Sequence, residues 1–138
     1  MKSVVEVKWN GRKNFSAAID DHTIIMDLDE ERGGNNEGPR PKPLMLASLG
    51  GCSGLDVISI LGKMKIEPDY FNMHIEGEQT EDLPKRYDKI KIIYEFKGKG
   101  LSLEKIKKAI ELSQDKYCGV SAVYRKSIDI SYEIRIDE

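Results

Sequence analysis

Histidine and cysteine are scarce in this 138-residue chain, which contains two of each. Neither His22 nor His74 has a second ligand at a His-x-x-x-His or Cys-x-x-Cys spacing, so the sequence predicts no metal site. A Gly-x-x-x-x-Gly-Lys-Ser/Thr phosphate loop is also missing, and no cofactor is expected. Nothing in the sequence supports a Ser-His-Asp or Cys-His catalytic pair.

The chain also lacks a large excess of one charge and a long apolar run. Its 22 basic and 24 acidic residues give a net charge of −2, which argues against a nucleic-acid partner. The longest apolar tract runs from Leu44 to Leu55, short of the roughly 20 residues that a membrane span needs. No apolar signal core follows Met1. We therefore expect a cytoplasmic protein, without a membrane partner, whose cysteines are reduced unless they are redox-active.

Alternation of apolar and polar residues predicts β-strands near residues 5–9, 15–19, 24–28, 71–75, 90–96 and 128–136. Asn10-Gly11 predicts a two-residue hairpin turn, and Asp20-Asp21 predicts a second turn. Residues 29–42 are polar and rich in Gly, Asn and Pro, so they are expected to form a mobile loop.

Two helices are predicted. Pro43 suits the first position of a helix that continues to Lys65 and is apolar on nearly every side, so this helix is expected to be buried in a core or against a partner chain. The second helix follows Ser102 as N-cap, and a short helical turn is expected after Gly119. The apolar stripe predicted for the helix after Ser102 consists of Leu103, Ile106, Ile110 and Tyr117. The resulting prediction is one α+β domain over residues 1–138, with the order βββ-α-ββ-α-β.

Three glycines surround Cys52 in the first helix, namely Gly50, Gly51 and Gly54. Each glycine costs a helix about 1 kcal/mol relative to alanine, so something must offset the loss. Close packing, with a helix contact at Gly51, is one explanation. Space for a substrate around Cys52 is a second explanation, compatible with the first.

Asp56 lies four residues after Cys52 and should share its helix face. A carboxylate at that place disfavours a thiolate, so a reactive Cys52 would need a cation, for which Arg12 and Arg40 are the candidates. The alternative is that Cys52 is simply a small buried apolar residue. Spacing alone does not tell whether Cys118, at the end of the second helix, meets Cys52.

Several segments in the correct order resemble the OsmC/Ohr family, the osmotically inducible and organic hydroperoxide resistance proteins, and most closely its YhfA-type OsmC-like branch. These segments are Gly38-Pro39-Arg40-Pro41, the stretch from Leu44 to Ser53, Asp56-Val57, Lys116-Tyr117-Cys118 and Val120-Ser121. The resemblance implies an OsmC-like fold whose long central helix packs in an intertwined homodimer.

The resemblance also implies a thiol peroxidase that reduces organic hydroperoxides. In such an enzyme Cys52 would attack the peroxide and become a sulfenic acid, and Cys118 would resolve it as a Cys52–Cys118 disulfide. A lipoyl-type dithiol would then reduce the disulfide. Arg12 matches the first-hairpin arginine of Ohr proteins, whereas Arg40 belongs to the loop of this chain.

One position departs from the family pattern. Lys42-Pro43 stands where family members carry the glutamate that orients the arginine. The departure keeps open a second function, a non-catalytic OsmC-like protein that binds small apolar or electrophilic ligands. A third interpretation, that residues 51–54 form the Gly-x-x-Gly loop of a KH-type RNA binder, fits poorly because Cys52-Ser53 supplies no basic residue.

Overall fold

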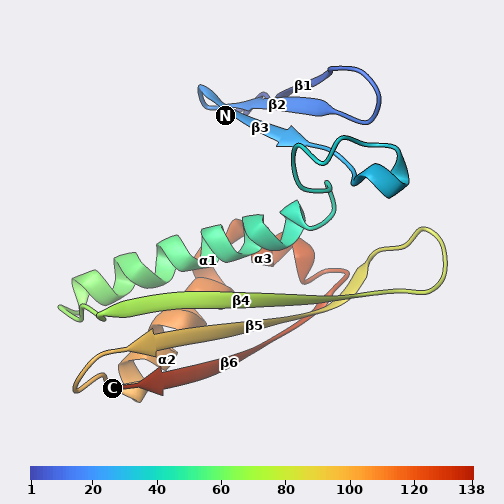
Figure 1. Cartoon of the computed structure of the whole chain (residues 1–138). Helices are drawn as coiled ribbons and strands as arrows, with labels where there is room; N and C mark the ends of the chain where they lie inside the picture. The colour runs from blue at the N-terminus through green and yellow to red at the C-terminus, as the bar shows by residue number, and fades with distance from the viewer. The chain divides into compact units, whose positions relative to one another are not determined.

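The computed structural model describes residues 1–138, which divide into two compact units, Met1–Met45 and Leu46–Glu138. Each unit has its own three-stranded sheet, with the strand orders β1-β2-β3 and β4-β5-β6 (Figure 1). The succession of strands and helices confirms the predicted α+β order βββ-α-ββ-α-β. That the whole chain forms one domain stays a prediction.

The first unit is an antiparallel meander of β1 (Glu6–Trp9), β2 (Phe15–Ile19) and β3 (His22–Met26). The predicted two-residue turn at Asn10-Gly11 is wrong. Trp9 pairs with Phe15, so residues 10–14 form the loop, and the Asn14 N–H donates to the Gly11 carbonyl at 3.0 Å. The Asp20-Asp21 turn is confirmed, since Ile19 pairs with His22.

Asp27 organises the loop that follows β3. Its buried carboxylate accepts hydrogen bonds from the backbone N–H groups of Leu28, Asn35 and Glu37, at 2.7, 3.3 and 3.2 Å. A short 3₁₀ helix, η1 (Glu30–Arg32), lies between these partners. Residues 29–42 were predicted to be a mobile loop from their composition. In the structure, hydrogen bonds to the Asp27 carboxylate hold part of this segment in a defined conformation.

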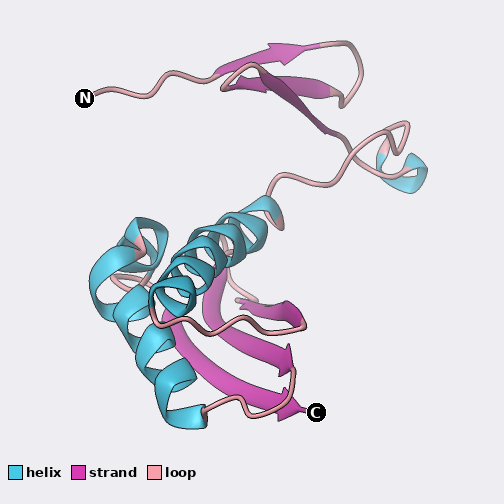
Figure 2. Ribbon diagram, turned by 90° about the vertical axis from the view of Figure 1, so that its left-hand side faces the viewer, coloured by secondary structure: helices cyan, strands magenta, loops and turns pink.

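The second unit is built on β4 (Tyr70–Gln79), β5 (Tyr87–Lys97) and β6 (Asp129–Asp137). The strands β4 and β5 are antiparallel, whereas β5 and β6 are parallel. A parallel pair requires a crossover connection, which consists here of α2 (Leu103–Leu112), η2 (Ser113–Tyr117) and α3 (Gly119–Tyr124). Figure 2 shows the helices of this unit gathered on one face of the sheet.

The long helix α1 (Leu44–Lys63) packs one face on this sheet through residues that include Leu49, Val57 and Leu61. Its opposite face carries Leu55 and Ile58, which are 71% and 43% exposed in the single chain. Burial of this face against a partner chain stays a prediction. By length and composition α1 also passes as a membrane span. This is weak evidence for a membrane, because the core helix of a soluble protein passes the same test.

The glycines around Cys52 lie on two different faces of α1. A Cβ on Gly50 would lie 3.2 Å from the Ile75 side chain, and one on Gly54 would lie 2.6 Å from Met73 Cε. A Cβ on Gly51 would have no neighbour within 4 Å. Within the chain, the close contact expected at Gly51 is therefore made by Gly50 and Gly54, which face β4.

The apolar stripe of α2 is shorter than predicted. Ile106 and Ile110 are fully buried, but Leu103 and Tyr117 are 57% and 53% exposed. Leu103 is the first residue of the helix, and Tyr117 belongs to η2, a π-helix whose wider turn changes the direction of later side chains. The N-cap is confirmed, because Ser102 Oγ accepts a hydrogen bond from the Lys105 N–H at 3.3 Å.

Candidate active site

The two cysteines and one carboxylate converge where α1 meets the crossover segment. Cys52 and Asp56 lie one helical turn apart, and Cys118 comes from the junction of η2 and α3. Both Sγ atoms and a carboxylate oxygen of Asp56 lie within 4.8 Å of one another. Both thiols are free, with Cys52 half-buried and Cys118 buried.

The π-helix η2 places the Cys118 sulfur. The Cys118 N–H reaches back to the Ser113 carbonyl at 2.7 Å, and the backbone then turns to an extended conformation. Cys118 thereby becomes the N-cap of α3, and its Sγ accepts a hydrogen bond from the Ser121 N–H at 3.3 Å. Single π-turns are frequent at functional sites, because they redirect one side chain without ending the helix.

Burial, a hydrogen bond with Cys52 and the nearby Asp56 carboxylate together raise the pKa of the Cys118 thiol from 9.0 to about 11, although the Ser121 N–H lowers it in part. Cys118 therefore keeps its proton at neutral pH.

Beneath the sulfurs, the Gln114 side chain is the centre of a buried hydrogen-bond network. Its Nε2 donates to Ser53 Oγ at 3.2 Å and to the Tyr94 hydroxyl at 2.9 Å. Its Oε1 accepts from Ser121 Oγ at 2.7 Å and from an Arg125 Nη atom at 3.1 Å. Both N–H groups and both lone pairs of the amide are thus used, which fixes its orientation.

A chain of hydroxyl groups leads from this amide to Asp56. Tyr94 and Ser53 are 2.6 Å apart, Ser53 and Ser113 are 3.1 Å apart, and Ser113 Oγ donates to Asp56 Oδ2 at 3.1 Å. Because Ser113 donates its only hydroxyl proton to the carboxylate, Ser53 must donate to Ser113 and Tyr94 to Ser53, so the hydroxyl protons point in one direction, from Tyr94 to Asp56. The buried network therefore ends in a carboxylate held beside two thiols.

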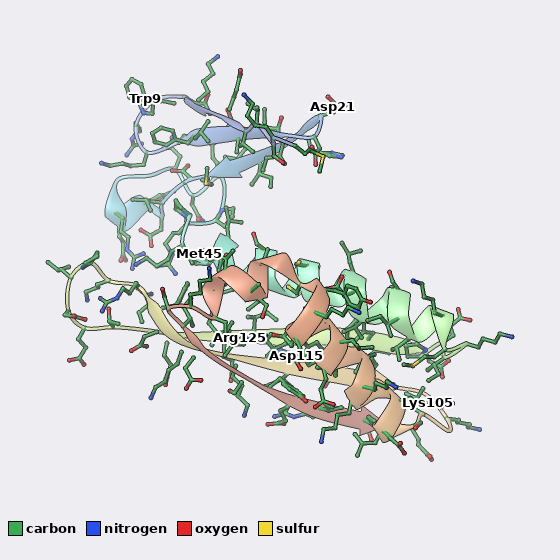
Figure 3. All side chains as sticks on the ribbon, turned by 180° about the vertical axis from the view of Figure 1, so that it is seen from behind. Trp9, Asp21, Met45, Lys105, Asp115 and Arg125 are labelled. Carbon is green, nitrogen blue, oxygen red and sulfur yellow. The ribbon has the colours of Figure 1, made fainter.

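Arg125 is one of several residues of this region that sequence reasoning missed, together with Gln114, Tyr94 and Ser113. Besides Gln114, it contacts Ser121 Oγ at 2.9 Å and pairs with Asp115 at 3.6 Å (Figure 3). The available signal was local, because Ser121 and Arg125 are four residues apart directly after Cys118 and so share a face of a short helix.

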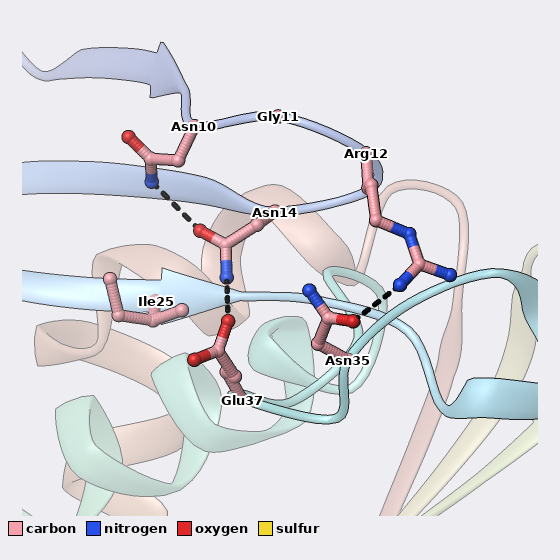
Figure 4. A pocket seen from close by; sticks show the side chains of 7 residues that line it. All are labelled: Asn10, Gly11, Arg12, Asn14, Ile25, Asn35 and Glu37. Carbon is pink, nitrogen blue, oxygen red and sulfur yellow. Dashed lines mark hydrogen bonds between the residues drawn. The ribbon is translucent and has the colours of Figure 1, made fainter.

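The predicted arginines both belong to the first unit, whereas the cysteines belong to the second. Arg12 lies in the β1–β2 loop and lines a pocket of about 470 Å³ (Figure 4). Its Nη1 donates to Asn35 Oδ1 at 2.6 Å. Arg40 is exposed in the loop that precedes α1. A role for either arginine beside Cys52 stays a prediction.

The chain is similar to several known proteins. The family model described as OsmC-like protein matches residues 34–133. The protein YhfA of Escherichia coli K12 is 30% identical over 131 residues, covering 93% of this chain and 95% of YhfA. A hypothetical protein from Aquifex aeolicus has a crystal structure with 31% identity and a TM-score of 0.84, covering 100% of this chain and 99% of that one.

An organic hydroperoxide resistance protein from Elizabethkingia anophelis is a more distant match. It is 14% identical, with a TM-score of 0.72 over 98% of this chain and 97% of its own. At that identity, the likeness shows a common fold and nothing more.

Proposed function

Because the chain belongs to the OsmC-like protein family, we propose that it is a two-cysteine peroxidase that reduces organic hydroperoxides. The observation that carries this proposal is the convergence of Cys52 and Cys118, whose sulfurs lie within 4.8 Å although the residues are far apart in sequence. A free thiol pair at this separation is close enough to form a disulfide after a modest movement of the side chains.

The two cysteines take different roles because their surroundings differ. Cys52 is the more exposed thiol, so it is the one that a peroxide reaches. The Cys52 thiol first gives up a proton, and its thiolate attacks the terminal oxygen of ROOH. The O–O bond breaks, Cys52 becomes a sulfenic acid, and the departing alkoxide takes up the proton to leave as ROH. Cys118, buried and protonated, then forms the disulfide and releases water.

A cation near Cys52 supports the first step, because the Asp56 carboxylate opposes a thiolate at that position. Arg12 and Arg40 are the residues that we propose for this role. A dithiol of the lipoyl type then reduces the disulfide by exchange, which regenerates both thiols. The reaction requires a reducing compartment, in keeping with a cytoplasmic protein.

We further propose a homodimer. The face of α1 that carries Leu55 and Ile58 is apolar and uncovered within the chain, and Gly51 leaves open space on the helix surface. An apolar helix surface of this kind is normally covered, and a second copy of the same helix is the simplest cover.

The proposal is tested by following consumption of cumene hydroperoxide and of hydrogen peroxide, with dihydrolipoamide as the reductant. We expect turnover with a preference for the organic peroxide, complete loss in Cys52→Ser, and a trapped sulfenic acid in Cys118→Ser. Peptide mapping of peroxide-treated protein should find the Cys52–Cys118 disulfide. Turnover by Cys118→Ser at the wild-type rate would remove Cys118 from the mechanism, and no turnover with either peroxide would refute the peroxidase.

A second function is favoured by one feature of the sequence. Lys42-Pro43 occupies the place of the helix-start glutamate, which leaves the arginine without its usual orienting partner. In that case the chain would bind small apolar or electrophilic ligands at Cys52 without turnover. Stoichiometric labelling of Cys52 by an electrophile, together with no peroxide consumption, would distinguish this function from the first.

A further inference from the structure

The carboxylate of Asp56 has no evident part in the peroxide step. It lies within 4.8 Å of both sulfurs, where its charge opposes the thiolate that attacks the peroxide. Nevertheless the protein holds it there firmly, through the hydrogen bond from Ser113 and the hydroxyl chain behind it. Because the Asp56 carboxylate opposes the attack on peroxide and is nevertheless held in place, we look for its role in another step of the reaction.

Disulfide formation is the step that needs such a group. The Cys118 thiol must lose a proton as its sulfur attacks the Cys52 sulfenic acid, and the hydroxyl that leaves Cys52 must gain one. Cys118 is only 2% exposed, so bulk water does not reach its sulfur freely. A neighbouring side chain is therefore required to move the proton.

The titratable groups around Cys118 leave one candidate. They are Cys52, Asp56, Tyr94 and Tyr124. Burial raises the pKa of both tyrosines, so each keeps its own proton at neutral pH. Cys52 is itself the group under attack. Only the Asp56 carboxylate is free to accept a proton.

We propose that Asp56 relays the proton during disulfide formation, a role that rests on the peroxidase function proposed above. As Cys118 Sγ bonds to Cys52 Sγ, the Cys118 proton passes to the Asp56 carboxylate, directly or through one water. The S–O bond of the sulfenic acid breaks, and Asp56 returns the proton to the departing oxygen, which leaves as water. Asp56 is thereby regenerated, one disulfide forms, and no external acid, base or electron is needed.

A small cavity provides an exit for that water. Asp56 lines a cavity of about 140 Å³ together with Ser59, Ile60, Lys63 and Tyr117. This volume holds several water molecules, and its walls offer polar partners. The carboxylate thus lies between the sulfurs and a space that water can occupy.

Substitution of Asp56 by Asn distinguishes a proton relay from a purely electrostatic role, because the two roles predict opposite changes in the rate of disulfide formation. The negative charge of Asp56 contributes to the raised pKa of Cys118. If charge were all that mattered, Asp56→Asn would ease ionisation of Cys118 and speed disulfide formation. A relay predicts that the same substitution slows it, by roughly a hundredfold as for other general acid–base groups.

The experiment mixes reduced protein with one equivalent of cumene hydroperoxide and follows two events: dimedone trapping of the Cys52 sulfenic acid, and loss of free thiol as the disulfide forms. In Asp56→Asn we expect sulfenic acid formation at least as fast as in the wild type and disulfide formation about a hundredfold slower. Asp88→Asn, which removes an exposed carboxylate from β5, is the matched control and should match the wild type in both events. Disulfide formation in Asp56→Asn at or above the wild-type rate would overturn the relay.

A peroxide-free measurement keeps this test independent of the proposed function. Cys52 is converted to a mixed disulfide with thionitrobenzoate, and release of the yellow thiol reports attack by Cys118. This reaction needs the Cys118 proton removed but no peroxide, so Asp56→Asn should slow the release as well. If Asp56→Asn released thionitrobenzoate slowly, Asp56 would be supported as the proton acceptor. If, in addition, the wild type formed no sulfenic acid with peroxide, the peroxidase function would be refuted while the role of Asp56 stood. Equal release rates would refute the role of Asp56.

Discussion

The ring of Tyr87 on β5 lies over Gly77 on β4, so closely that a Cβ on Gly77 would stand 2.7 Å from Tyr87 Cδ1. Tyr87 is buried, and the ring has little room to withdraw. We expect Gly77→Ala to lower the free energy of unfolding by about 1–3 kcal/mol, as other overpacking substitutions do. Urea unfolding followed by circular dichroism measures the change.

The matched control for that substitution is Gly119→Ala at the first residue of α3, where the glycine is exposed and an added Cβ meets nothing within 4 Å. There alanine should change the free energy of unfolding by less than about 1 kcal/mol. If Gly77→Ala unfolded at the same urea concentration as Gly119→Ala, the close approach of the Tyr87 ring would be of no energetic consequence.

Gly51→Leu tests the proposed homodimer. Since a Cβ on Gly51 would meet nothing within 4 Å in its own chain, the variant should keep the secondary structure of the wild type. If a second copy packs against this surface, the leucine will clash with it, and the dissociation constant of the dimer should rise at least tenfold. Sedimentation measures the dissociation constant, with circular dichroism as the control for folding. A wild-type protein that sediments as a stable 15.7 kDa monomer at micromolar concentration would refute the dimer.

Arg125→Ala removes the charged partner of Gln114 and Ser121. Loss of hydrogen bonds from a charged donor should lower the free energy of unfolding by about 1–3 kcal/mol. Because Ser121 also binds the Cys118 sulfur through its N–H, disulfide formation should slow as well. Arg135→Ala, which removes an exposed arginine paired with Glu133 on the same strand, should change stability by less than about 0.5 kcal/mol. Equal effects of the two substitutions would contradict a positioning role for Arg125.

The raised pKa of Cys118 predicts a loss of stability at alkaline pH. Its thiol has a pKa of about 11 in the folded chain, against a reference of 9.0, so the folded state binds the proton more tightly than the unfolded state. The stabilisation is complete below about pH 9 and declines as the pH rises toward 11. The difference between wild type and Cys118→Ser isolates this contribution from the lysines and tyrosines. A difference that stays constant from pH 8 to 11 would contradict it.

Asp27 predicts a dependence on acid pH. Burial alone would raise the pKa of its carboxyl, but hydrogen bonds from Leu28, Glu37, Asn14 and Asn35 together lower it below the ordinary 3.8. The carboxylate therefore stabilises the first unit above that pH, and the stabilisation is lost as the pH falls through the lowered value. The protection factors of the Asn35 and Glu37 amides, which correct for the intrinsic pH dependence of hydrogen exchange, should fall at low pH, and in Asp27→Asn they should be low at every pH. An Asp27→Asn loop as protected as the wild type would be inconsistent with this role.

Local periodicity predicted much of this molecule. Alternation located the strands, and the i,i+4 spacing of Cys52 and Asp56 placed both on one helix face, because these patterns depend only on the geometry of a single element. The meeting of Cys52 with Cys118 depends on the crossover that joins two parallel strands and on a π-turn within it. Neither leaves a repeating signal in the sequence. The same holds for Gln114 and Arg125, whose partners come from other segments of the chain.

The position of the two sulfurs, on the long helix and on the crossover, has a consequence for the oxidised chain. A bond between Cys52 and Cys118 would tie off a loop of roughly 65 residues that contains all of β4 and β5, and loop-closure entropy alone would then favour the folded state by about 4 kcal/mol. The thermal melting temperature would thus report the oxidation state directly. The oxidised form would be the more heat-resistant one, and the reduced form, which reacts with peroxide, would unfold more easily.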